Sequence, residues 1–191
     1  MASTSVVDPA RIRSLNEAPP RSDGRYVLYW MQQAQRPRGN AALELAVRSA
    51  DKYGLPVLVG FGLTDDYPEA TARHYAFMLE GLKDCAEILA DRGIGFAIRR
   101  GAPAEVALDL SRDAAAVICD RGYLPHQVAW RKTLSDGTDC PVVQVETDVV
   151  VPVDVVSDKS EYAARTIRPK IHRVWDEYLV PLDDSDPEVA A

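Results

Sequence analysis

The stretch YVLYWMQQAQRPRGN, residues 26–40, joins a strand-like run to a polar loop and a helix start. Its first six residues are aromatic, β-branched or long apolar, which is typical of a strand buried on both faces. Three glutamines and two arginines follow within residues 32–38. Asn40 is a good N-cap for a helix that would end before Gly54, where a left-handed C-cap belongs. The stretch therefore predicts a strand, a loop and a helix in succession.

The same alternation continues along the chain. Further β-branched runs bounded by Gly, Pro or Asp occupy residues 56–62, 95–100, 115–120 and 141–146. Helical patterns separate them, and the longest, at about residues 71–92, places Leu82 and Leu89 on one apolar face that we expect to lie on the sheet. Five strands joined by crossovers predict an α/β fold, a five-stranded, doubly wound parallel sheet of Rossmann-like type with strand order 3-2-1-4-5.

Three regions follow from this pattern. Residues 1–24, which contain a Pro-Pro pair, are expected to be a flexible N-terminal segment. Residues 25–156 form the predicted α/β domain. Residues 157–191 are interpreted as a basic linker helix interrupted by Pro169, followed by an acidic tail from residue 181 that we expect to be flexible.

Composition excludes several classes of protein. A chain of 191 residues with 47% apolar content can bury one core, and its net charge of −7 argues against a general nucleic-acid binder. No apolar run reaches the roughly 18 residues of a membrane span and the N-terminus lacks a signal-peptide pattern, so we expect a cytoplasmic protein. Cys85, Cys119 and Cys140 lack CxxC spacing and are interpreted as small buried hydrophobes.

Common catalytic motifs do not occur in the sequence. It contains no GxGxxG after the first strand, no GxxxxGK[ST], no GxSxG and no HExxH, and its three histidines lack metal-ligand spacing. Ligands of open α/β sheets bind beyond the carboxyl ends of the strands where strand order reverses, here between residues 26–31 and 115–120. The loop at 32–38 would border that crevice. An ordinary solvated loop is the alternative.

Three segments resemble one family. YVLYWMQQAQRPRGNAALELA (26–46), FGLTDDYPEATARHYAFMLEGL (61–82) and EYAARTIRPKI (161–171) resemble the N-terminal region of class II cyclobutane pyrimidine dimer photolyases, and the likeness runs from about residue 11 to about 175. That family is a group of DNA-repair carbon–carbon lyases. The resemblance implies an antenna-type domain joined by a linker to a helical domain that binds FAD and damaged DNA. We expect this chain to contain only the antenna-type domain and part of the linker. It should therefore not repair pyrimidine dimers alone, and we expect DNA contact only through the helical domain, in the same or a separate chain.

The resemblance also implies an antenna chromophore, a deazaflavin or a folate. Leu124 stands where folate-binding relatives carry an acidic residue, which favours the deazaflavin. Arg73 would supply a guanidinium and Tyr123 a stacking surface. The complete candidate set for cofactor binding is Met31, Gln32, Gln33, Arg73, Asp120, Arg121 and Tyr123. No catalytic or metal-binding residue is assigned. A nucleotide- or chromophore-binding or scaffold module of the same fold, without a role in DNA repair, is the alternative function.

Overall fold

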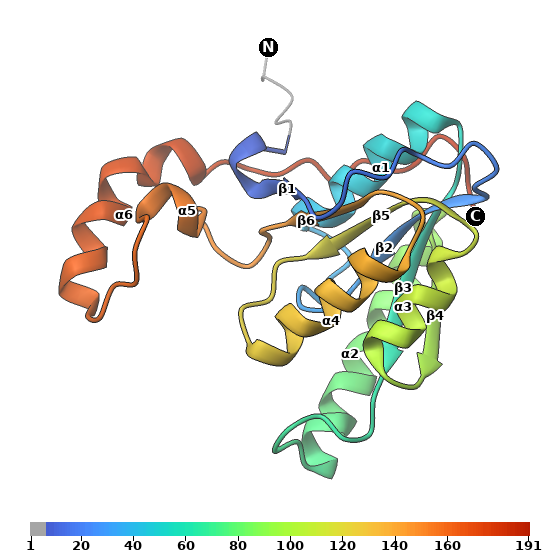
Figure 1. The fold of residues 1–191 in the computed structure, drawn as a ribbon, viewed down its shortest axis with the longest axis horizontal. Helices are drawn as coiled ribbons and strands as arrows, with labels where there is room; N and C mark the ends of the chain where they lie inside the picture. Colours follow the sequence, from blue (N-terminus) through green and yellow to red (C-terminus); the bar gives the residue numbers. More distant parts are fainter. Residues whose placement is uncertain (1–6) are drawn as a thin grey trace.

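The computed structural model describes residues 7–191, which form one sheet flanked by helices on both faces (Figure 1). The sheet order is β1-β6-β5-β2-β3-β4. Its parallel strands are β2 (Tyr26–Trp30), β3 (Val57–Leu63), β4 (Gly95–Arg100), β5 (Ala114–Asp120) and β6 (Val142–Val145). Taken in chain order, these five strands have the predicted arrangement 3-2-1-4-5. The α/β fold class is therefore confirmed.

The sheet has a sixth strand that the sequence analysis did not predict. β1 (Ile12–Ser14) pairs antiparallel with β6, with Ile12 opposite Val145. It follows a single 3₁₀ turn, η1 (Pro9–Arg11). The Arg11 guanidinium donates to the carbonyl oxygens of Glu146 at 3.0 Å and Val149 at 2.9 Å. Residues 7–24 of the segment that we expected to be flexible thus contribute an edge strand that is too short to carry an alternating pattern. Residues 1–6 of that segment lie outside the described residues.

In the described residues, six α-helices connect and flank the strands. They are α1 (Ala41–Tyr53), α2 (Ala72–Asp91), α3 (Pro103–Ser111), α4 (Pro125–Gly137), α5 (Val153–Val156) and α6 (Ala164–Tyr178). The caps predicted for α1 are confirmed. The Asn40 side chain accepts a hydrogen bond from the Leu43 amide at 3.0 Å, and Gly54 has φ 65° at the C-cap. This left-handed conformation is the reason for a glycine there.

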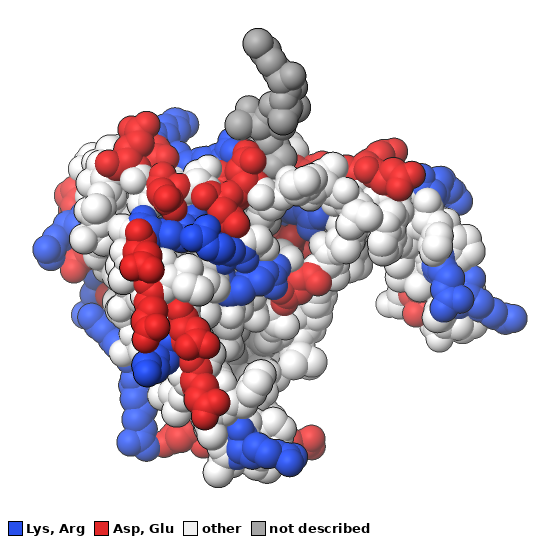
Figure 2. Space-filling model, turned by 180° about the vertical axis from the view of Figure 1, so that it is seen from behind, with Lys and Arg blue, Asp and Glu red and all other residues white. Residues whose placement is uncertain are grey.

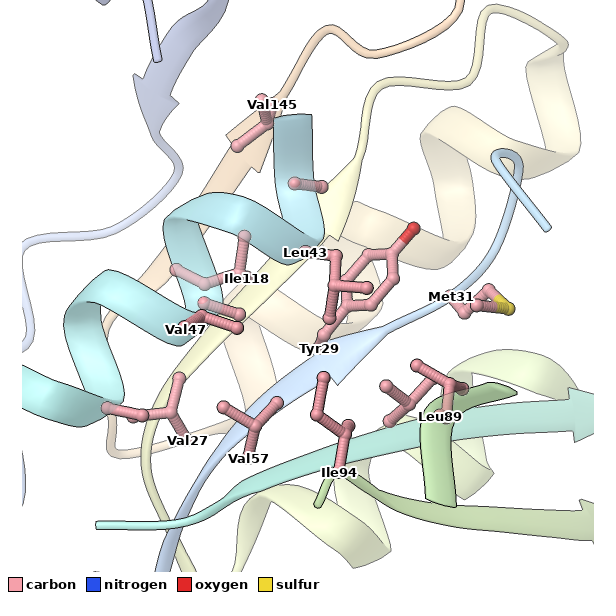
Figure 3. Packing of buried hydrophobic residues seen from close by; sticks show 14 of the residues in the cluster. Val27, Tyr29, Met31, Leu43, Val47, Val57, Leu89, Ile94, Ile118 and Val145 are labelled. Atoms are coloured by element: carbon pink, nitrogen blue, oxygen red, sulfur yellow. The ribbon is translucent and has the colours of Figure 1, made fainter. Parts of the chain in front are cut away.

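Strand β2 is buried on both faces, as its sequence predicts. Val27, Tyr29 and Met31 pack with α1 and α2 on one face (Figure 3), whereas Leu28 and Trp30 pack with α3 and α4 on the other. The three cysteines are buried and free, which agrees with their interpretation as hydrophobes. Because β2 lies in the middle of the core, the loop that leaves it starts from a rigid base.

The acidic tail follows a defined path back from α6 along α1 (Figure 1), which differs from the expected flexible segment. Leu182 packs against the core beside α1. The Ser185 amide and hydroxyl donate to the buried Glu44 carboxylate at 3.0 and 2.9 Å. The Arg92 guanidinium pairs with Asp186 at 2.9 Å. The tail is held by polar partners, which its composition alone does not reveal.

Helices α5 and α6 form an arm that projects from the body (Figure 1). None of the described residues of α6 is buried, and Pro169 lies inside the helix. On the face shown in Figure 2, acidic and basic side chains are interspersed over the body, and both kinds also lie on the arm. Among the described residues, no helix combines the length and apolar character needed to cross a bilayer.

Candidate ligand-binding site

A cavity of about 440 Å³ opens at the carboxyl ends of β2 and β3. Met31, Gln32 and Gln33 line it from the loop after β2. The loop between β3 and α2 and the first turns of α2 form a second wall, and Gln127 and Trp130 of α4 form a third. A volume of this size suits a small planar ligand or cofactor. The cavity lies at the end of the sheet where α/β proteins commonly bind ligands.

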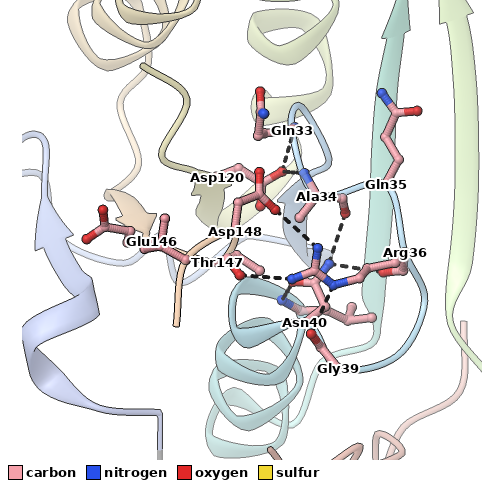
Figure 4. A network of polar contacts seen from close by, with 12 residues as sticks. Gln33, Ala34, Gln35, Arg36, Gly39, Asn40, Asp120, Glu146, Thr147 and Asp148 are labelled. Carbon is pink, nitrogen blue, oxygen red and sulfur yellow. Dashed lines mark hydrogen bonds and ion pairs between the residues drawn. The ribbon is translucent and has the colours of Figure 1, made fainter. Parts of the chain in front are cut away.

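Asp120 fixes the loop that leads from β2 into the cavity (Figure 4). The backbone N–H groups of Gln32, Gln33 and Ala34 all donate to its Oδ2, at 3.0, 2.8 and 2.9 Å. The Tyr29 hydroxyl donates to its Oδ1 at 2.9 Å. Burial raises the pKa of Asp120 above its usual value, and these accepted hydrogen bonds oppose that rise. Asp120 therefore positions the loop from beneath.

The remainder of the polar loop is occupied by contacts to its own backbone and to the loop after β6. The Asn40 amide donates to the carbonyl oxygens of Ala34 at 3.1 Å and Arg36 at 3.0 Å. The Arg36 guanidinium donates to Asp148 at 3.1 Å and to the Thr147 carbonyl at 2.8 Å (Figure 4). Most of the polar character of residues 32–40 thus holds the loop in one shape. The side chains at the start of the loop are left to face the cavity.

A cluster of three aromatic rings, those of Tyr67, His126 and Trp130, lies at the wall of the cavity. The Tyr67 hydroxyl lies 3.1 Å from His126 Nε2, with the two rings edge to face at 5.1 Å. The His126 and Trp130 rings are 4.9 Å apart. This contact brings the loop between β3 and α2 against α4. Tyr67 and Trp130 line the cavity themselves, so a planar ligand would meet aromatic surface there.

The cavity carries little charge. Among its described lining residues the only carboxylate is that of Glu69, and none is Lys or Arg. Two polar side chains in its wall, Trp30 and Gln32, have buried nitrogen or oxygen atoms without a hydrogen-bond partner in the described structure. An uncharged ring system with its own donors and acceptors fits this lining best.

The structure brings together three of the seven candidate residues. Met31, Gln32 and Gln33 line the cavity, whereas the other four lie outside its lining. Arg73 is exposed in the first turn of α2, beside the lining residue His74. Asp120 lies beneath the loop. Its sequence neighbours Arg121 and Tyr123 face the loop after β6.

Arg121 and Tyr123 are engaged around Glu146. The Arg121 guanidinium lies 3.3 Å from the Glu146 carboxylate and 2.7 Å from that of Asp154, and the Tyr123 hydroxyl donates to Glu146. Asp120 and the amides that it binds fill the space between β2 and β5, where the sequence analysis placed the crevice. The cavity opens instead between the loops that follow β2 and β3.

Sequence reasoning did not nominate Trp30, Tyr67, Gln127 or Trp130. Trp30 was assigned to the buried strand, and it is both core and cavity wall. Tyr67 lies in the loop after β3, which the strand order did place near the site. Gln127 and Trp130 carry no local signal, because α4 reaches the cavity only through the packing of the whole sheet.

Comparisons with known proteins agree with this architecture. Residues 27–188 match the family model for DNA photolyase. The chain is 45% identical over 177 residues to the deoxyribodipyrimidine photo-lyase of Methanothermobacter thermautotrophicus, covering 93% of this chain and 40% of that protein. It is 40% identical over 149 residues to the enzyme of the same name from Potorous tridactylus, covering 76% of this chain and 28% of that one.

A solved structure supports the fold. The class III photolyase of Agrobacterium tumefaciens superposes with a TM-score of 0.64 at 21% identity, over 88% of this chain and 36% of that one. The chain thus spans about two fifths or less of the length of these relatives. It belongs to the DNA photolyase family and corresponds to the N-terminal α/β domain of its members.

Proposed function

We propose that this chain is the antenna-type domain of a light-dependent DNA-repair photolyase and that its cavity holds a light-harvesting chromophore. The observation that carries the proposal is the cavity itself. Gln32 contributes a polar side chain to its lining, Tyr67 and Trp130 form an aromatic wall, and the lining has almost no charge. In the full-length protein, photoexcited reduced FAD would split cyclobutane pyrimidine dimers by electron transfer. FAD and DNA would bind outside this chain, which alone would not repair dimers.

A deazaflavin fits the cavity better than a folate. The lining offers Tyr67 and Trp130 for the face of a planar ring and glutamine amides for its edges. A folate carries a glutamate tail, and the described lining contains no Lys or Arg to pair with its carboxylates. This reasoning agrees with the expectation drawn from Leu124 and rests on different residues.

A pair of tyrosine variants tests where the chromophore binds. We expect 8-hydroxy-5-deazariboflavin to bind the chain saturably in a fluorescence titration, and 5,10-methenyltetrahydrofolate to bind more weakly. Tyr67→Ala removes part of the wall and should weaken binding of the deazaflavin by about 1–2 kcal/mol. Tyr123→Ala is the matched control, because Tyr123 lies outside the lining.

The opposite effects of the two tyrosine variants would assign the chromophore to a different site. Loss of affinity in Tyr123→Ala with unchanged affinity in Tyr67→Ala would place the chromophore beside Tyr123, at the loop that follows β5. A folded wild-type chain that binds neither compound would contradict the proposed function altogether.

A further inference from the structure

Unpartnered polar atoms gather at one side of the cavity. In the described part of the chain, four buried side-chain nitrogen or oxygen atoms lack a hydrogen-bond partner. Three of them are Trp30 Nε1 and the two amide atoms of Gln32, and both residues line the cavity. The fourth belongs to Arg131. Buried polar atoms are almost always paired in native proteins, so this concentration at one site requires an explanation.

The two side chains line the same cavity and come from neighbouring positions, at the end of β2 and just after it. Trp30 is the last residue of β2 and is 1% exposed. The Gln32 amide N–H is fixed by Asp120 at 3.0 Å, so the backbone cannot shift to find partners for the side chain. Only the side-chain torsions of Gln32 can therefore bring its side-chain amide group to a ligand.

Two other glutamines of the site, Gln33 and Gln127, are bonded to each other, and a third, Gln35, is exposed. The Gln127 amide nitrogen donates to the Gln33 side-chain oxygen, and the Gln127 oxygen accepts from the Leu124 backbone N–H at 3.1 Å. Among the buried polar atoms of the described lining, the Trp30 and Gln32 groups are therefore the set that a ligand would satisfy. That set consists of two donors, the indole N–H and the amide NH₂, and one acceptor, the amide oxygen.

We propose that Trp30 and Gln32 recognise the imide edge of a pyrimidinedione ring. Such an edge presents two carbonyl oxygens with an N–H between them, which are two acceptors and one donor. Each of its three groups therefore has a matching partner among the indole N–H, the amide NH₂ and the amide oxygen of the protein. The corresponding edge of a pterin presents an amino group, a ring N–H and one carbonyl, and would leave a donor facing a donor. This inference rests on the proposed function and assigns Trp30 and Gln32 as its specificity-determining residues.

Methylation of the imide nitrogen gives a direct test. The probes are 8-hydroxy-5-deazariboflavin and its 3-methyl derivative, which differ only in that N–H. We expect wild-type protein to bind the methylated compound about tenfold more weakly or worse, since it leaves the Gln32 oxygen unpaired and adds bulk. Gln32→Met keeps the length of the side chain without its polar atoms and should bring the two affinities much closer together.

A tryptophan pair supplies a second variant with its control. Trp30→Phe removes the indole N–H and should weaken binding of the unmethylated compound severalfold. Trp175→Phe makes the same change on α6, outside the cavity, and should have no effect. Because the Gln32 amide has no partner in the free chain, Gln32→Met without ligand should unfold at the same or a higher temperature than wild type.

Three results would overturn the inference. Equal affinity of wild type for both compounds would show that the protein does not recognise the imide edge, although the proposed chromophore site would be unaffected. If Gln32→Met still distinguishes the methylated from the unmethylated compound, another residue recognises the imide nitrogen. A lower melting temperature for ligand-free Gln32→Met would mean that the amide already has a partner. If a folded wild type binds neither compound, the proposed function and this inference fail together.

Discussion

Asp120 is the residue that most separates the sequence prediction from the observed site. Its place at the end of β5 was predicted, and so was its nearness to the loop at 32–38. Its role was not predicted. The three backbone N–H groups that donate hydrogen bonds to Asp120 belong to residues 86 to 88 positions earlier in the chain, and no sequence pattern marks them. A carboxylate at a strand end can face a ligand or hold a loop. Only the packed structure distinguishes the two.

Replacing Asp120 should unfold the chain more easily. Asp120→Ala would leave the backbone N–H groups of Gln32, Gln33 and Ala34 without their acceptor, and we expect the free energy of unfolding to fall by about 2–4 kcal/mol. Urea denaturation measures this. Asp148→Ala is the control, because it breaks a more exposed pair with Arg36 and should cost less than about 1 kcal/mol. Similar losses in both variants would contradict the anchoring role.

At the scale of elements, long periodic segments were predictable and short polar ones were not. Leu82 and Leu89 of α2 are buried on the sheet as the helical spacing requires. Leu79 is one helical turn before Leu82, yet it is 44% exposed, because the first half of α2 runs past the sheet (Figure 1). β1 and the acidic tail lack periodicity. They are placed by backbone pairing with β6 and by the buried charges of Glu44 and Arg92.

Hydrogen exchange should detect the contact between the tail and α1. Glu44→Ala removes the acceptor of the Ser185 amide, and we expect faster exchange across residues 183–191 than in wild type. Exchange in α6 should not change, since none of its residues is buried against α1. Glu105→Ala changes an exposed glutamate in the first turn of α3 and serves as the control. Tail amides that exchange at the rate of an unstructured peptide in wild type would contradict the defined path.

At the scale of the whole molecule, the family and the fold could be predicted together. The strand–loop–helix at 26–46 carries both the resemblance and the first unit of the sheet. The position of the cavity could not be predicted, because it depends on where the side chains beyond the carboxyl ends of the strands leave space. Asp120 and its partners fill the gap between β2 and β5, and the aromatic contact of Tyr67 with α4 bounds the opening beside β3.

The measurement that tests the central claim most directly is the response of the three tryptophan indole N–H signals to a deazaflavin. Trp30 and Trp130 line the cavity, and Trp175 lies on the projecting arm. In a ¹H–¹⁵N spectrum of the folded chain, saturating 8-hydroxy-5-deazariboflavin should shift the indole signals of Trp30 and Trp130 and leave that of Trp175 in place. A shift confined to Trp175, or no shift at a concentration that saturates binding, would contradict a chromophore site between β2, β3 and α4.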